Sequence, residues 1–246
     1  MRGDLTAETI SIAGDGGDQI EAYLARPTDE GARGGVVVIH HLPGYDAATK
    51  EIARRFAAEG FNALCPNLYS REAPGADPDD AAALVRSQGG VSDERLVGDV
   101  EGAAAHLRSL ATSNGKVGSI GYCSGGRQSF LSAAKVDLQA AVDCYGAFVV
   151  GEVPEGFPLK VGPLEHLVPE LRSPLLGLFG MEDSYPAPAD MERLDGLLTA
   201  AGKPHSFHYF EGAGHGFFSV DRPAYRPEAA KEGWRLVLDF YGEHLS

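Results

Sequence analysis

The 246-residue sequence has only three cysteines, one tryptophan and no long apolar run. Cys65, Cys123 and Cys144 are odd in number and lack C-x-x-C spacing, which argues against both a disulfide framework and a zinc site. The apolar runs are far shorter than the roughly 20 residues that span a membrane. The first residues, MRGDLTAETI, lack the basic and apolar regions of an export signal. We therefore expect a cytoplasmic protein without a metal centre.

Basic residues are also scarce. Lys and Arg number 21 against 35 Asp and Glu, for a formal net charge of −14 without long acidic runs. This balance argues against binding to nucleic acid or to an anionic membrane surface, because both need a basic patch. We expect a small-molecule partner, in a chain that is a monomer or a homodimer.

The apolar pattern alternates between short strand-like runs and longer helical stripes. That alternation is typical of an α/β fold with a mostly parallel central sheet of about eight strands and helices on both faces. The length suits a single domain over residues 1–246. The expected strands are 8–14, 19–25, 34–40, 62–66, 116–121, 140–146, 174–180 and 205–210. The first two flank the turn signal GDGGD and should form an antiparallel hairpin at one edge.

Helical spacing is clearest near residues 52–57, 96–107 and 234–241, where apolar residues recur at i, i+3 and i+4. Two stretches, 70–80 and 146–173, are rich in proline and glycine. We expect these to be irregular, because loops of this length often form lids or pocket walls.

The motif with the clearest chemistry is GYCSGGR, residues 121–127. It matches G-x-C-x-G, the nucleophile-elbow pattern with cysteine as nucleophile, between an expected strand and helix. Gly121 and Gly125 leave room for a sharp turn that projects the Cys123 sulfur from the sheet. The free N–H of Ser124 would face a developing oxyanion. The same helix terminus favours thiolate over thiol.

A nucleophilic thiol needs a base and an acid that orients the base. His215 is the best base, because it lies in the glycine-flanked loop EGAGHGFF after an expected strand. Asp183 is the favoured acid, since it follows the strand 174–180 at the edge where ligands bind in open α/β sheets. Glu182 and Asp143 remain as rivals.

The segment HHLPGYD, which follows the strand 34–40, should supply the second oxyanion donor. Leu42 has a backbone N–H there, whereas Pro43 has none. His40 and His41 are adjacent and cannot both face the pocket; His41 is the favoured pocket residue. Tyr145, directly after a strand and near the elbow, is a candidate wall residue.

Four blocks, ALCPNLYSR, NGKVGSIGYCSGG, GLFGMEDSYPAP and EGAGHGFF, follow one another along the chain. In order and spacing they resemble the dienelactone hydrolase family, a branch of the α/β-hydrolases with a cysteine nucleophile. The resemblance covers nearly the whole chain. It implies the α/β-hydrolase fold, a triad of Cys123, Asp183 and His215, and oxyanion donors at Leu42 and Ser124. It also implies a cofactor-free hydrolase of enol lactones.

The sequence departs from the family at two positions that affect the substrate. His41 stands where well-known members have a glutamate that interacts with the cysteine. Ser219 stands where they have an arginine that holds a substrate carboxylate. Arg71 and Arg86 are the remaining candidates for holding that carboxylate, although Arg71 could instead brace a loop.

These features predict acyl transfer to Cys123. A thiolate leaves a tetrahedral intermediate more readily than an alkoxide, so the chemistry favours enol lactones, enol esters or thioesters. One alternative is a general carboxylesterase or thioesterase acting on a neutral substrate. A less favoured alternative is a sensing protein whose Cys123 is oxidised or alkylated without turnover.

Overall fold

The computed structural model describes residues 4–42 and 44–246. Its strands form one eight-stranded sheet in the order β1-β2-β4-β3-β5-β6-β7-β8. β1 pairs antiparallel with β2, β2 pairs antiparallel with β4, and the remaining neighbours are parallel. The strands are β1 (Leu5–Ala13), β2 (Gln19–Pro27), β3 (Arg33–Ile39), β4 (Asn62–Pro66), β5 (Ser113–Tyr122), β6 (Ala140–Cys144), β7 (Leu175–Gly180) and β8 (His205–Phe210). The predicted strands and the edge hairpin are confirmed.

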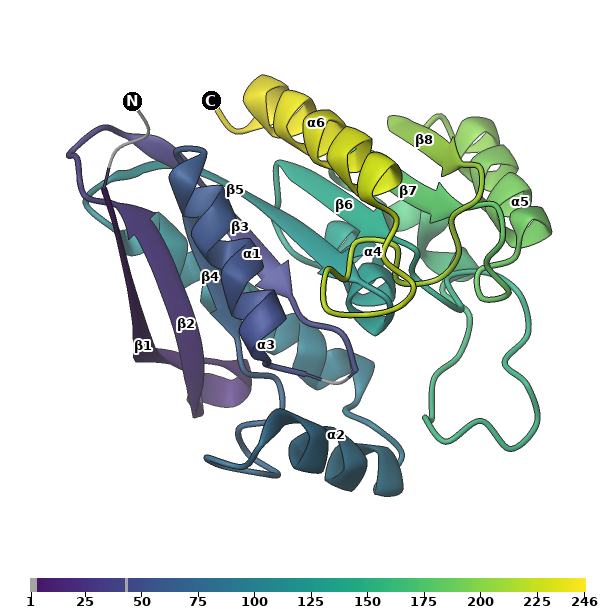
Figure 1. The fold of residues 1–246 in the computed structure, drawn as a ribbon, viewed down its shortest axis with the longest axis horizontal. Helices are drawn as coiled ribbons and strands as arrows, with labels where there is room; N and C mark the ends of the chain where they lie inside the picture. Colours follow the sequence, from purple (N-terminus) through teal and green to yellow (C-terminus); the bar gives the residue numbers. More distant parts are fainter. Residues whose placement is uncertain (1–3, 43) are drawn as a thin grey trace.

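Helices cover both faces of this sheet, as predicted. α1 and α6 lie on the face nearer the viewer in Figure 1, whereas α3 and α4 lie behind the sheet. The helices are α1 (Ala47–Ala58), α2 (Pro78–Ser87), α3 (Asp93–Ser109), α4 (Ser124–Lys135), α5 (Pro188–Ala200) and α6 (Pro227–His244), with short 3-10 turns η1 (Asp15–Gly17) and η2 (Glu165–Glu170). Within the described residues, no helix combines the length and apolarity needed to cross a membrane.

The central strands are apolar on both sides because both of their faces are covered. Val36 and Val38 of β3 pack with α1 and α6, whereas Val37 and Ile39 pack with α2 and α3. This alternation follows from the two-residue period of a strand. A third apolar cluster joins α4, α5 and η2 to the end of the sheet that contains β7.

The two stretches expected to be irregular differ from each other. Part of 70–80 is regular, because α2 begins at Pro78 with Asp77 as its N-cap. Proline in the first turn, acidic residues beside it and an aspartate cap are all helix-start signals, so the sequence contained evidence for this helix. In 146–173, η2 is the only helix among the assigned elements. Both stretches lie near the carboxyl ends of the parallel strands.

Candidate active site

Cys123 occupies the sharp turn between β5 and α4. Its φ of 57° and ψ of −120° are unusual for a non-glycine residue. A Cβ at Gly121 would lie 1.8 Å from the Gly125 carbonyl oxygen, and a Cβ at Gly125 would lie 2.4 Å from that of Ile39. Only glycine fits at these two positions, so the glycines permit the turn. Backbone strain of about 1–3 kcal/mol at such a residue is characteristic of functional sites.

His215 lies between an acid and the thiol. Its Nδ1 is 2.8 Å from Oδ2 of Asp183, whose side chain is 3% exposed. The other Asp183 oxygen accepts a hydrogen bond from the Tyr185 N–H at 2.9 Å. Burial favours neutral imidazole, but hydrogen bonds with Asp183 and with Cys123 outweigh it and raise the pKa of His215 to about 10. The structure therefore brings together the three residues that the sequence singled out.

Neither rival acid forms a hydrogen bond or an ion pair with His215, whose carboxylate partner is Asp183. Glu182 is exposed on the turn before Asp183. Asp143 is 1% exposed, and its Oδ1 accepts a hydrogen bond from the Gly146 N–H at 2.7 Å. Burial raises the pKa of Asp143 to about 7.

The loop after β3 lies beside the elbow. Ile39 pairs with Gly121 in the parallel register, so the residues that follow the two strands run side by side. Leu42 and Ser124 line the same hollow, and the Ser124 N–H has no acceptor inside its own helix. Pro43 lies outside the described residues.

The two adjacent histidines have different environments. His40 is 1% exposed; its Nδ1 is 2.9 Å from the His41 carbonyl oxygen and its Nε2 accepts the Leu68 N–H at 3.1 Å. Burial lowers the pKa of His40 to about 4, so this residue is neutral and structural.

His41 instead faces a groove lined by α1 and by residues 218–220. Its Nε2 lies 2.8 Å from Oδ2 of Asp46, the N-cap of α1. Burial opposes ionisation of Asp46, but hydrogen bonds from His41 and from the Thr49 N–H lower its pKa to about 2. Asp46 was not among the predicted site residues, although its position at the start of a helical stripe is an N-cap signal.

The structure places Arg71 away from the elbow. Its guanidinium bonds both oxygens of the fully buried Asp99 on α3, at 2.8 and 2.9 Å, and Asp18 beside the β1–β2 turn at 3.0 Å. Arg71 therefore braces the edge hairpin against α3, and it lines neither hollow beside Cys123. This corrects its assignment as a pocket candidate.

Arg86 is exposed on α2. Burial is the main cause of the raised pKa of Tyr69; a negative charge on Cys123 raises this pKa further, and the positive charge of Arg86 lowers it. Tyr69 therefore lies near both Arg86 and the elbow. It lines the hollow shared by Leu42 and Ser124, a role that the sequence did not single out. Tyr145 is 1% exposed, and its ring packs edge-on against His215 with the ring centroids 5.1 Å apart.

The model of the family described as "Dienelactone hydrolase family" matches residues 20–245. The chain belongs to the dienelactone hydrolase family. It is accordingly a hydrolase that acts on carboxylic ester bonds.

Relatives of similar length support the assignment to the dienelactone hydrolase family. A Pseudomonas putida protein named "Carboxymethylenebutenolidase" is 31% identical over 242 residues, which cover 96% of each chain. A "Putative carboxymethylenebutenolidase" from Synechocystis sp. is 30% identical, over 92% of this chain and 93% of the relative. The crystal structure of a "Putative Dienelactone Hydrolase" from Klebsiella pneumoniae superposes with a TM-score of 0.85 at 27% identity, covering 97% of this chain and 99% of the other. The last comparison agrees with the α/β-hydrolase fold.

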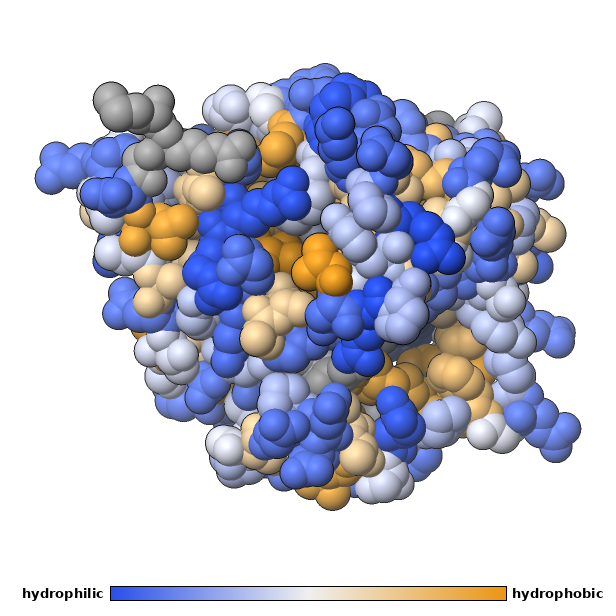
Figure 2. Space-filling view, viewed as in Figure 1, coloured by the Kyte–Doolittle hydropathy of each residue, from blue (hydrophilic) through white to orange (hydrophobic). Residues whose placement is uncertain are grey.

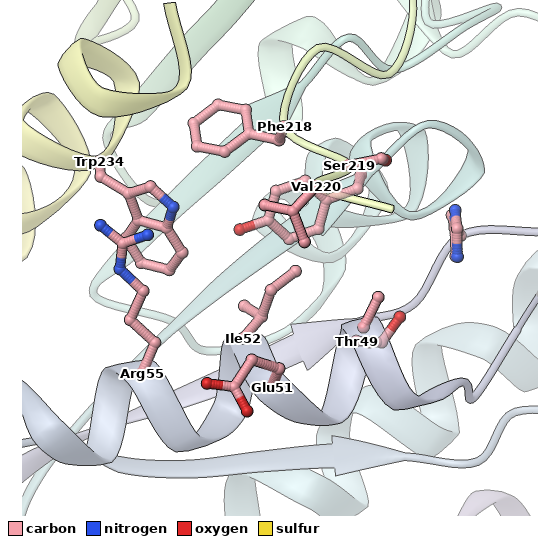
Figure 3. Close-up of a pocket in the computed structure, with 11 residues that line it drawn as sticks. Thr49, Glu51, Ile52, Arg55, Phe218, Ser219, Val220 and Trp234 are labelled. Atoms are coloured by element: carbon pink, nitrogen blue, oxygen red, sulfur yellow. The ribbon is translucent and has the colours of Figure 1, made fainter. Parts of the chain in front are cut away.

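In this member of the dienelactone hydrolase family, two hollows flank the elbow. One is the hollow of Leu42, Ser124 and Tyr69. The other is the groove between α1 and residues 218–220, into which His41 and Ser219 also face. Figure 3 shows this second groove, with Ile52 on the α1 side and Val220 opposite.

Proposed function

We propose that this chain hydrolyses an enol lactone or a similarly activated ester by acyl transfer through Cys123, His215 and Asp183. The proposal rests on one observation, the placement of His215 within hydrogen-bonding reach of both a buried carboxylate and the elbow thiol. The relatives named carboxymethylenebutenolidase support the choice of an enol lactone.

The first half of the reaction forms an acyl-enzyme. His215 takes the Cys123 proton, and Asp183 stabilises the resulting imidazolium. The thiolate attacks the ester carbonyl carbon, and the N–H groups of Leu42 and Ser124 donate to the oxyanion. The intermediate collapses with cleavage of the ester C–O bond, and His215 returns the proton to the leaving oxygen. A lactone ring opens at this step and stays attached as the acyl group.

The second half consumes one water. His215 takes a proton from the water as its oxygen attacks the thioester carbonyl. The thioester bond then breaks, and the proton returns to the sulfur. The product is the carboxylic acid, and Cys123 is regenerated.

A neutral ester is the second candidate substrate, and two observations favour it. Ser219 occupies the position where the family resemblance implies an arginine, and Arg71 is fully engaged by Asp99 and Asp18. Among the arginines proposed to hold a substrate carboxylate, this leaves Arg86 on α2 as the candidate.

The test is steady-state hydrolysis of a dienelactone and of a neutral enol ester with a leaving group of matched acidity. We expect the wild type to turn over at least one of them and Cys123→Ala to lose at least 1,000-fold in kcat/KM, as when a covalent nucleophile is removed. Cys65→Ala is the matched control, because Cys65 is a buried core thiol. It should retain most activity.

Two results would count against the proposal. Full activity in Cys123→Ala would remove the elbow cysteine as nucleophile. Stoichiometric alkylation of Cys123 without turnover of either ester would favour the sensing alternative. The ratio of the two wild-type kcat/KM values decides between an anionic and a neutral substrate.

A further inference from the structure

The groove between α1 and residues 218–220, called here the α1–α6 groove, is lined at one end by Trp234 of α6. Its walls are formed by apolar side chains, chiefly Ile52, Phe218, Val220 and Trp234. Figure 3 shows Arg55 stacked on Trp234 at one end of the groove, and the guanidinium carbon lies 3.9 Å from the ring centroid. On the largely hydrophilic face of Figure 2, hydrophobic residues gather between α1 and the loop that precedes α6.

This groove adjoins the proposed triad. Tyr122 lines it and directly precedes Cys123. Ser219 lines it and follows His215 by four residues, on the same loop. His41 lines it and follows β3, which runs in register beside the strand that carries the elbow. A group attached to an ester oxygen that His215 protonates therefore has a short path into the groove.

Charges near the groove are already paired. Glu51 accepts a hydrogen bond from the Arg54 side chain at 2.7 Å. Arg55 stacks on Trp234, and the imidazole of His41 is held by Asp46. A charged ligand group would lose its hydration on entering such a site without gaining a free partner of opposite charge. An uncharged group avoids this desolvation cost.

The groove also contains one unused polar group. The Tyr122 hydroxyl is buried and finds no hydrogen-bond partner within the described residues. Tyr122 as a whole is 4% exposed, so water reaches it poorly. A buried hydroxyl without a partner is unfavourable, and a ligand oxygen that accepts its hydrogen would remove the penalty.

We propose that the α1–α6 groove binds the leaving-group side of the ester, and that it selects an uncharged aromatic group with a hydrogen-bond acceptor for Tyr122. This inference rests on the proposed function for the direction in which the substrate lies. The aromatic edges of Tyr122, Phe218 and Trp234 suit a flat ring.

Binding can be measured without turnover, because Trp234 is the only tryptophan in the sequence. In Cys123→Ala, nitrobenzene, a neutral aromatic quencher with acceptor oxygens, should quench Trp234 fluorescence saturably. The anionic analogue 4-nitrobenzoate should quench it only by collision. Val220→Asp, at a residue 63% exposed, places a carboxylate in the groove and should abolish saturation. Leu84→Asp on α2 is the matched control, at a residue that is 40% exposed, and its quenching should remain saturable.

The kcat/KM values of esters with different leaving groups test whether the leaving group lies in the α1–α6 groove. Val220→Asp should lower kcat/KM for phenyl acetate about tenfold or more, whereas the control Leu84→Asp should leave it unchanged. For vinyl acetate, whose leaving group is small, the loss in Val220→Asp should be clearly smaller than for phenyl acetate. Tyr122→Phe should weaken saturable quenching by nitrobenzene several-fold.

The outcomes separate the two proposals. Quenching that is linear in nitrobenzene, or equal effects of Val220→Asp and Leu84→Asp, would overturn the groove proposal even if esters are hydrolysed. Saturable quenching abolished by Val220→Asp, in a protein that hydrolyses no ester, would support the binding site and reject the proposed reaction.

Discussion

At the scale of single residues, Asp143 shows how the elbow stores unfavourable energy. Its carboxyl group is buried, its Oδ2 has no hydrogen-bond partner within the described residues, and Gly126 of the elbow helix packs directly on Oδ1. Burial raises the pKa of Asp143 from 3.8 to about 7. Between these two pH values, the folded protein keeps a proton on Asp143 that the unfolded chain releases.

Asp143→Asn should therefore stabilise the protein in a pH-dependent way. The pKa of Asp143 is higher in the folded protein than in the unfolded chain. Its contribution to the free energy of unfolding is therefore fully present below about pH 4 and is lost as the pH rises through about 7. The variant should match the wild type near pH 4 and exceed it at pH 8 by up to about 4 kcal/mol, from a shift of about three units. Urea denaturation at both pH values measures the difference. Asp137→Asn, at a side chain 85% exposed, should show no such trend.

At the scale of elements, the elbow depends on how closely β3, β5 and α4 approach. Gly125→Ala would place a Cβ against the carbonyl oxygens of Ile39 and His40, at 2.4 and 2.8 Å. The turn must then shift, and kcat/KM should fall by more than about 100-fold, since displacements near 1 Å have effects of that size. Gly196→Ala on α5, where a new Cβ meets nothing within 4 Å, should retain activity. Equal activity of the two variants would show that the elbow tolerates a side chain.

The edge hairpin provides a second test at this scale. Asp99 is fully buried and joins α3 to the hairpin through Arg71, whereas Asp18 contacts the same guanidinium from a side chain 67% exposed. Asp99→Ala should cost about 3–5 kcal/mol, because it leaves a partly buried charge unpaired. Asp18→Ala should cost less than about 1 kcal/mol. Denaturant unfolding compares them, and similar costs would argue against the bracing role of the buried pair.

At the scale of the whole molecule, the net charge of −14 creates a field that repels anions. An anionic dienelactone should therefore be captured more slowly at low ionic strength than at high. We expect its kcat/KM to rise several-fold between about 20 and 500 mM salt, as the Debye length shortens. A neutral enol ester provides the control and should change little. A flat profile for the anion would indicate a local positive charge, with Arg86 as the first candidate.

Some of this organisation could be predicted because it depends on residues close together in the chain. The strands follow from short apolar runs, and the elbow follows from glycines at fixed spacing around Cys123. α2 was missed in part because proline and glycine upstream of Pro78 obscured a valid helix start. The roles of Cys123, Asp183 and His215 remain predictions.

The sequence by itself determined the α/β architecture, the edge hairpin and the elbow, because local periodicity and turn chemistry specify them. Only the tertiary structure decided that Arg71 is bound by Asp99 and that His41 is bound by Asp46. It also decided that the Tyr122 hydroxyl is buried without a hydrogen-bond partner among the residues that the structure describes. These outcomes depend on which charges and polar groups become buried together, and burial is set by packing between distant segments. The α1–α6 groove also depends on tertiary structure, since its walls come from parts of the chain that meet only in the folded state.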